Sequence, residues 1–212
     1  TVDRAAQTDA VGKESYSYSF ENVQAGHEVS VTFIRKSYKI TFTMDGKGNV
    51  TYDKGDGDVV VGGSVSVEKF DESTEVTVTA TPADNYRVSQ VTIDGGDPKN
   101  FVDNDKEYRH VFEMNQDHSF SVVFSLNTYT VTVKAGHGGK VTVAPSTVED
   151  GSSATVEYGG SATVTIKPDD GYNLESVMLN GTETEAYTSN DNGSEYTLEI
   201  TNIAKGQEVE VK

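Results

Sequence analysis

The sequence predicts an all-β protein made of tandem small β-sandwich-like or β-grasp-like repeat domains in an elongated array. Three observations lead to this prediction: β-branched side chains fill most apolar positions, apolar residues alternate along short runs, and the same runs recur along the chain. Valine occurs 29 times and threonine 24 times, whereas leucine occurs only 4 times. β-Branched side chains fit a pleated sheet and lose rotamer freedom in helices, so strands are expected throughout.

The acidic composition excludes several classes of partner. There are 34 Asp and Glu residues against 17 Lys and Arg, which gives a formal net charge of −17 at pH 7. A field of that sign repels phosphate backbones and anionic lipid headgroups, so we expect no nucleic-acid binding. No apolar run approaches the roughly 18 residues of a membrane-spanning helix, so we expect no membrane insertion. The chain has no cysteine, which excludes disulfides, thiolate catalysis and Cys-based metal centres.

An internal repeat is visible in the sequence. Residues 38–42 (YKITF) and 129–133 (YTVTV) open two similar stretches, and each opening leads through a Gly-rich turn into another apolar run. Further on, residues 75–86 (EVTVTATPADNY) parallel residues 161–172 (SATVTIKPDDGY). The turn pairs Asp94-Gly95 and Asn180-Gly181 follow in the two stretches. Both stretches therefore predict strand-turn-strand units with the same order of elements.

The end of the repeat occurs a third time, near the start of the chain. Residues 16–31 (YSYSFENVQAGHEVSV) match residues 196–211 (YTLEITNIAKGQEVEV). We therefore expect residues 1–36 to be the C-terminal part of a preceding repeat, residues 37–127 the first complete repeat, and residues 128–212 a second, nearly complete one that stops short of an equivalent of Phe124. On this interpretation the chain is a segment of a longer array.

The alternation predicts seven strands in the first complete repeat, listed here by residue number: 38–44, 49–52, 59–67, 75–81, 87–93, 107–114 and 119–125. Residues 59–70, with their acidic lead-in, are interpreted as an insertion that the second repeat lacks. A second departure is Asn85, which stands where the second repeat has Gly171.

The pattern over residues 129–211 resembles the divergent internalin B-type bacterial repeat. The matching features are the alternating opening strand, the GHGGKV turn at 136–141, the segment ATVTIKPDDGY at 162–172 and the closing strands. This resemblance implies a module found in strings within secreted or wall-attached bacterial proteins. It also implies a β-grasp-like or sandwich-like structure without known catalytic residues.

The sequence offers no strong catalytic or cofactor motif, and we expect no enzyme activity and no cofactor. Asp53, Asp56 and Asp58 lie in a Gly-rich loop, where alternate carboxylates are calcium ligands in other proteins. The loop lacks the later bidentate Glu, so a solvated acidic turn is the favoured interpretation and calcium the weaker alternative. Gly-x-Ser-x-Gly, phosphate-binding and dinucleotide-binding motifs are missing.

The histidines and tyrosines favour structural roles. His27 and His118 fall at matching hairpin positions, where the third copy has Gln207, and metal-ligand spacings such as His-x-x-x-His are absent. His110 and His118 are placed to meet across a hairpin, but two histidines make an incomplete site. Six tyrosines recur at equivalent places and are expected at the core edge rather than on a sugar-stacking surface. They are Tyr38, Tyr86, Tyr108, Tyr129, Tyr172 and Tyr196.

Two functions from different classes follow. Repetition, turn-rich β units and an acidic surface favour a stalk or spacer in an adhesin-like protein, extracellular or attached to the cell wall, whose neighbours are further repeats. The alternative is a binding module for a host protein or a glycan, which exposed edge strands would serve.

Overall fold

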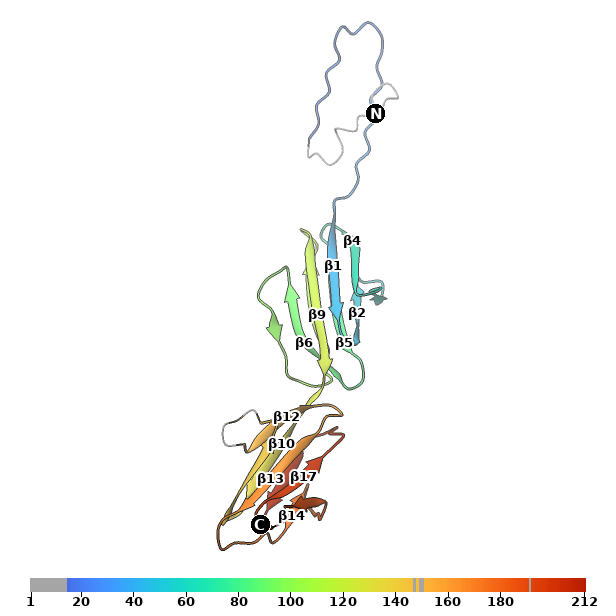
Figure 1. The fold of residues 1–212 in the computed structure, drawn as a ribbon. Coiled ribbons are helices and arrows are strands. Elements are labelled where there is room, and N and C mark those ends of the chain that lie inside the picture. Colours follow the sequence, from blue (N-terminus) through green and yellow to red (C-terminus); the bar gives the residue numbers. More distant parts are fainter. Residues whose placement is uncertain (1–14, 147, 149–150, 191) are drawn as a thin grey trace.

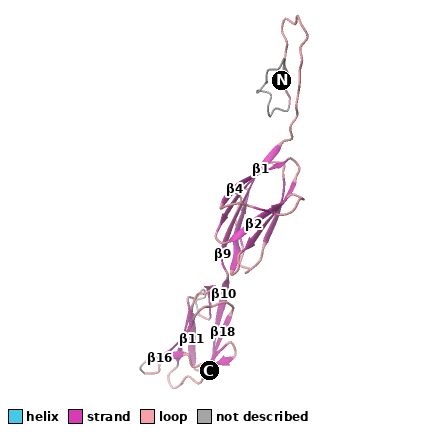
Figure 2. Cartoon of the chain, turned by 90° about the vertical axis from the view of Figure 1, so that its right-hand side faces the viewer, coloured by secondary structure: helices cyan, strands magenta, loops and turns pink. Residues whose placement is uncertain are grey.

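The computed structural model describes residues 15–146, 148, 151–190 and 192–212, and every regular element in that range is a strand. Two β-repeats lie end to end, with the N-terminal segment beyond one of them and the C-terminus at the far end of the other (Figure 1). Figure 2 shows the same two bodies from the side, each made of strands joined by loops. The predicted all-β class and tandem arrangement are confirmed.

The first repeat contains nine strands: β1 (Ser37–Asp45), β2 (Gly48–Asp53), β3 (Val59–Val60), β4 (Val65–Asp71), β5 (Glu75–Pro82), β6 (Tyr86–Ile93), β7 (Lys99–Asn100), β8 (Tyr108–Glu113) and β9 (His118–Leu126). The second repeat contains β10 (Thr128–Ala135), β11 (Gly139–Ala144), β12 (Ser153–Glu157), β13 (Ala162–Pro168), β14 (Val177–Leu179), β15 (Thr182–Glu183), β16 (Tyr187–Ser189), β17 (Tyr196–Ile200) and β18 (Gln207–Val211).

Both repeats share one two-sheet topology. The larger sheet has the order β4-β1-β9-β6-β7 in the first repeat and β12-β10-β18-β14-β15 in the second. In each, the first strand pairs in parallel with the last, β1 with β9 and β10 with β18, while the other neighbours are antiparallel. The smaller sheets share β2-β5-β8 and β11-β13-β17, with β3 and β16 added at opposite edges.

Strict alternation along the strands fills one core in each repeat. In β5, Val76, Val78 and Ala80 are buried between half-exposed threonines, and in β13 the same places hold Ala162, Val164 and Ile166. Because successive side chains of a strand point to opposite faces, this alternation directs one side chain in two to the core. The first core is rich in Phe, and the second is built mainly from Val and Ile.

The turns that join the strands use equivalent hydrogen bonds in the two repeats. Tyr86 N donates to Ala83 O, as Tyr172 N donates to Asp169 O, both at 2.9 Å. The residue before each tyrosine is left-handed, with φ of 66° at Asn85 and 86° at Gly171. Asn and Gly are the residues that adopt this conformation at least cost, which explains why one replaces the other.

The predicted strand at 59–67 is wrong, because the run is divided between the two sheets. Residues 59–60 form β3 at the edge of the smaller sheet, and β4 begins at Val65 in the larger one. Gly63 has a φ of 73° and breaks the run between them.

Most of the predicted insertion at 59–70 also has a counterpart. β4 pairs with β1 through Tyr38 and Phe70, as β12 pairs with β10 through Tyr129 and Val156. The strand that lines this sheet edge is therefore common to both repeats, and β3 is the added part.

Residues 15–36 contain no extended strand element, although residues 16–31 match β17 and β18 in sequence. In the complete repeats, the equivalent strands pair with β1, β5 and β6 or their counterparts, and strands of that kind depend on such neighbours. The turn residue is nevertheless preserved, since φ is 50° at Asn22 and 52° at Asn202. Residues 1–14 of the segment lie outside the described residues.

Phe124 allows the first core to be tested. Its side chain is 3% exposed and its ring lies over Gly48. We expect Phe124→Ala to lower the free energy of unfolding of the first repeat by about 3–5 kcal/mol, as for other buried Phe side chains. Urea denaturation would measure this. Phe33→Ala is the matched control, because Phe33 is 91% exposed and its removal should change stability by less than about 0.5 kcal/mol.

Candidate functional site

The junction between the repeats holds the buried polar residue among those that the structure describes, Asn127. β9 ends at Leu126 and β10 begins at Thr128, so Asn127 alone links the two repeats. Its side chain is buried, with 1% of the residue exposed, although it belongs to a polar class that usually lies at the surface. Buried polar groups cost free energy unless they are hydrogen-bonded, so the partners of Asn127 define the junction.

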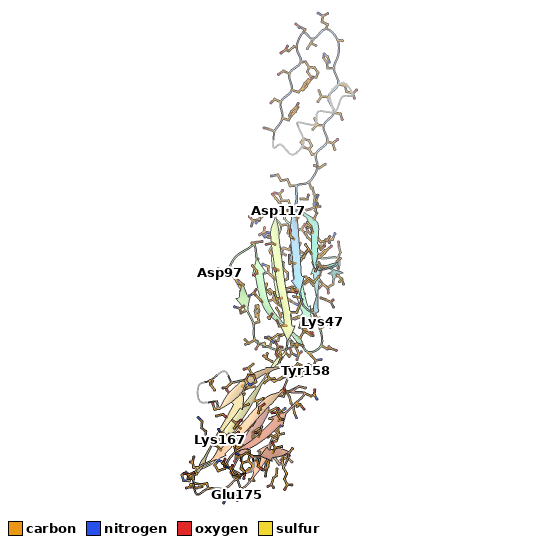
Figure 3. The ribbon with its side chains drawn as sticks, viewed as in Figure 1. Lys47, Asp97, Asp117, Tyr158, Lys167 and Glu175 are labelled. Carbon is orange, nitrogen blue, oxygen red and sulfur yellow. The ribbon has the colours of Figure 1, made fainter. Side chains whose placement is uncertain are left out.

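Both repeats bind the backbone of Asn127. Its N–H donates to Asn85 O in the first repeat at 2.8 Å, and its carbonyl accepts from Tyr158 N in the second repeat at 2.8 Å. Tyr158 and Lys47, from the facing ends of the two repeats, lie on the two sides of this junction in Figure 3. The backbone of this one-residue linker is therefore hydrogen-bonded to both repeats, which defines its conformation.

The loop between β7 and β8 supplies most of the side-chain contacts. Asn127 Nδ2 donates to Asp105 Oδ1 at 2.7 Å. Asn104 holds the next residue in both directions: its Oδ1 accepts from Thr128 N at 3.0 Å, and its Nδ2 donates to Thr128 O at 2.7 Å. From β6, Arg87 Nη1 donates to the carbonyl of Leu126. Three side chains of the first repeat thus form hydrogen bonds with the three consecutive residues 126, 127 and 128 at the junction.

The N-terminal segment is attached to the first repeat through the same backbone bond. Glu72 N donates to Lys36 O at 2.9 Å, which reproduces the bond from Tyr158 N to Asn127 O. Glu72 and Tyr158 both follow the edge strand of the larger sheet, β4 or β12. In each repeat, the backbone N–H that follows the edge strand therefore donates to the residue just before the first strand of that repeat.

His110 and His118 lie beside one aromatic ring. The ring of Phe112 packs against both, with ring centroids 4.5 Å from His110 and 4.7 Å from His118. Burial lowers the pKa of His110, and the charge of Lys99 lowers it further. His118 Nδ1 donates to Asp94 Oδ2 at 2.9 Å. The second repeat makes the equivalent contact from Asn180 Nδ2 to Gln207 Oε1 at 2.6 Å, so this is a hairpin contact common to the repeats.

The acidic loop at Asp53 is held by its own backbone. Asp53 Oδ1 accepts from Gly55 N at 2.7 Å and from Gly57 N at 3.0 Å, and these bonds lower the pKa of the Asp53 carboxyl. Asp56 lies 3.7 Å from Lys54 Nζ. Among the described residues no three His, Cys, Asp or Glu side chains gather as a metal-binding group. Calcium binding by Asp53, Asp56 and Asp58 stays the weaker alternative to a solvated turn, and calorimetric titration at millimolar calcium would test it.

The tyrosines lie mainly at the core edges. Five of the six repeated tyrosines are partly buried against one of the two cores, namely Tyr38, Tyr86, Tyr108, Tyr129 and Tyr196. Tyr172 is the exception, because it is 48% exposed and its hydroxyl lies 3.2 Å from His137 Nε2. They come from different strands and do not form one aromatic platform.

In the part of the chain that the structure covers, no helix has the length and apolar character to cross a membrane.

Sequence reasoning missed the junction residues. Asn127 stands between two predicted strands, and Asn104 and Asp105 lie in an ordinary polar loop. The sequence feature that could have pointed to the junction was a polar residue, Asn127, in a linker too short to be flexible. Which loop would reach it depends on the tertiary structure.

A comparison with models of known protein families agrees with the repeat seen in the sequence and the fold. The family model for the divergent InlB B-repeat domain matches residues 58–128 and 129–204, which confirms the resemblance predicted from the sequence. No curated protein matches the chain.

Two of the solved structures give distant likenesses. A mutant of the major pilin from Streptococcus pyogenes is 11% identical, over 82% of this chain and 97% of the pilin, with a TM-score of 0.22. The I9-I11 tandem from titin is 7% identical, over 84% of this chain and 96% of the tandem, with a TM-score of 0.19.

The Asp53 loop provides a test of its hydrogen bonds. Asp53→Ala removes the acceptor for the N–H groups of Gly55 and Gly57, so we expect faster hydrogen exchange at these two amides. Amide exchange followed by NMR would measure it. Asp58→Ala, in the same loop, is the control and should leave both rates unchanged; equal rates in the two variants would contradict the role given to Asp53.

Proposed function

Because this chain belongs to the divergent InlB B-repeat domain family, we propose that it acts as a non-catalytic stalk or spacer in a bacterial cell-surface or secreted protein of the adhesin type. It would lie outside the cell or attached to the cell wall. The proposed partners are neighbouring repeats of the same chain, and the proposal includes no cofactor and no reaction.

The single-residue junction carries this proposal. The parallel pairing of the first and last strands places the start and the end of each repeat at opposite ends of its larger sheet. A linker of one buried residue, bonded by both repeats, then sets them end to end (Figure 1). Repeats joined in this way extend reach with each added copy, which is the property a spacer needs.

The surface supports the same role. The ion pairs of the described residues join mainly exposed side chains, such as Lys106 with Asp103 and Lys167 with Glu195, and exposed pairs of this kind contribute little stability. An acidic surface with a net charge of −17 keeps neighbouring chains apart. It thus favours an extended, soluble array.

The stiffness of the junction can be measured between spin labels, since the chain has no cysteine of its own. Labels at Asp97→Cys and Lys167→Cys report on the two repeats (Figure 3). We expect a narrow distance distribution by pulsed electron paramagnetic resonance. It should broaden when Asn104→Ala removes the two bonds to Thr128, because the linker then loses its side-chain support.

Asn100→Ala is the matched control, because the Asn100 side chain accepts a hydrogen bond from Gln90 Nε2 and takes no part in the junction. Small-angle scattering of the same proteins should show an elongated particle. A compact particle in which the repeats fold back on each other would contradict the spacer proposal, as would a broad distribution in the unmodified chain.

A binding module is the second candidate, and the exposed valines of the first repeat favour it. Val60 on β3 and Val65 and Val67 on β4 are more than half exposed, and these two edge strands are joined by a short loop. At the position of Val67 the second repeat has Ser153 on β12, by the register with the opening strand. Edge strands with free backbone groups accept strands of partner proteins.

This candidate predicts saturable binding of the folded chain to a component of a glycan or matrix-protein array. Val65→Lys should reduce that binding, since a charge at an edge strand opposes strand addition. Thr155→Lys on β12 is the control. If the array shows no binding by the unmodified chain, only the spacer role remains.

A further inference from the structure

Two neighbouring strands carry any tension that passes through the first repeat. The preceding segment enters the repeat at β1, and the second repeat is attached one residue after β9. β1 and β9 lie side by side and run in the same direction, away from the N-terminal segment and towards the second repeat (Figure 1). A pull along the array therefore draws β1 back towards its start and β9 forward towards its end. These opposite pulls act along the strands, so they load the pairing of β1 with β9 in shear.

The pairing of β1 with β9 forms a continuous ladder. It has six successive pairs, from Ile40 with His118 to Asp45 with Val123. Hydrogen bonds between parallel strands are evenly spaced along the strands. A shear load is therefore shared by the whole ladder, whereas a load that separates the strands from one end breaks the bonds one after another.

Both loaded strands are also paired with a second neighbour. β1 pairs with β4 over residues 37–43, and β9 pairs with β6 over residues 120–126. β1 and β9 are thus inner strands of the larger sheet. The backbone groups of an inner strand are paired on both sides, so the loaded ladder has no free strand edge beside it.

Core side chains fix the register of this ladder. Phe42 pairs with Phe120, both are 0% exposed, and their ring centroids lie 6.4 Å apart. A slip by one residue would turn these side chains to the outer face, so the nearest alternative register lies two residues away, about 6.6 Å along the strand. To reach it, β1 must withdraw Ile40 and Phe42 from the core. A shear load is therefore opposed by core packing as well as by hydrogen bonds.

Further contacts hold the points where the load enters and leaves the ladder. At the start of β1, Lys39 N donates to Asp117 Oδ1 at 3.0 Å, and Lys39 Nζ lies 3.6 Å from Asp117 Oδ2. Asp117 directly precedes β9 and lies at the end of the repeat where β1 begins (Figure 3). At the end of β9, Arg87 Nη1 donates to Leu126 O. The start of β1 is thus bonded to the start of β9, and the end of β9 to its neighbour β6.

The rest of the repeat is shielded by this ladder. The strands between β1 and β9 in the sequence, including the whole smaller sheet, belong to the stretch of chain that the ladder closes off. While the ladder holds, tension does not reach these strands. Once it yields, residues 37–126 are released as extended chain, which lengthens the molecule by about 260–290 Å.

The second repeat has the same arrangement. β10 and β18 are parallel, with pairs from Val131 with Gln207 to Ala135 with Val211. Asn127 alone connects β9 to β10, so a load passes from one ladder to the next without a flexible linker.

We propose that the parallel ladder of each repeat is a mechanical clamp that keeps the array folded under tension. The proposal rests on the spacer role, because tension reaches the ladders only when the repeats are joined end to end. It adds a function to reach, since an array of this kind transmits force between its ends without lengthening. Such resistance is set by the rate of unfolding under load and not by the free energy of unfolding.

Two pulling directions on the first repeat test the proposal, with the full chain held in optical tweezers by handles on introduced cysteines. Arg35→Cys with Thr130→Cys pulls along the array and loads the ladder in shear. Arg35→Cys with Gln116→Cys pulls on the starts of β1 and β9 and separates them from one end. All three side chains are exposed. At the same loading rate, we expect the shear direction to need about twofold higher force or more, because the pairs of the ladder share the load.

Asp117→Ala tests the ladder in the shear direction. It removes the acceptor for the Lys39 N–H at the loaded end, so unfolding at constant force should accelerate by about 2- to 10-fold, the range that one hydrogen bond implies. Asp103→Ala is the matched control, because Asp103 pairs with Lys106 in the loop between β7 and β8. It should leave the unfolding rate unchanged.

Equal forces in the two pulling directions overturn the proposal, as does a higher force when the strands are separated from one end. Equal unfolding rates for Asp117→Ala and Asp103→Ala also contradict it. The spacer proposal fails or stands separately, because small-angle scattering reports on the shape of the array without load. An elongated particle whose first repeat unfolds at the same force in both directions is a spacer without a clamp.

Discussion

The parallel pairing of the first and last strands of each repeat is the constraint on which the architecture depends. β9 lies between β1 and β6, and β18 lies between β10 and β14, so the last strand closes each larger sheet at its centre. Parallel neighbours run in the same direction, and the chain therefore leaves a repeat at the end opposite to its entry. An antiparallel closing strand would return the chain to its starting end and prevent end-to-end stacking.

The short linker follows from this geometry. When exit and entry already face each other, a single residue suffices, and the burial of Asn127 removes the freedom that a longer linker would have. The cost of burying its polar backbone is offset by bonds to Asn85 and Tyr158, one in each repeat. The equivalent bond between Lys36 and Glu72 indicates that the attachment is a property of the repeat and not of one junction.

The central position of the last strand also explains why its length matters. β9 extends far enough for Phe124 to cover Gly48, and the first core is closed at that end. In the second repeat, β18 takes the same central place beside β10 and β14. Strand β6 is long where its partner is long, because a strand is stabilised by the pairs it makes with its neighbours. In the first repeat, the position of Phe124 thus connects core packing with sheet length.

The sequence by itself determined the strand class, the repeat and most of the turns, whereas only the tertiary structure decided which strands are neighbours and what meets at the ends of the repeats. β-Branched alternation set the faces of β5 and β13, and the pairs Asp94-Gly95 and Asn180-Gly181 take left-handed conformations at the predicted turns. These are local properties, because side-chain direction alternates along any strand and Asn, Asp and Gly accept positive φ. The run at 59–67 reads as one alternating strand, yet it is divided between two sheets at Gly63. Asn104 and Thr128 are 24 positions apart in the sequence and hydrogen-bonded at the junction, since their contact depends on the path of the loop between β7 and β8. Alternation determines which face of a strand is buried, whereas long-range strand pairing determines which other strands that face packs against.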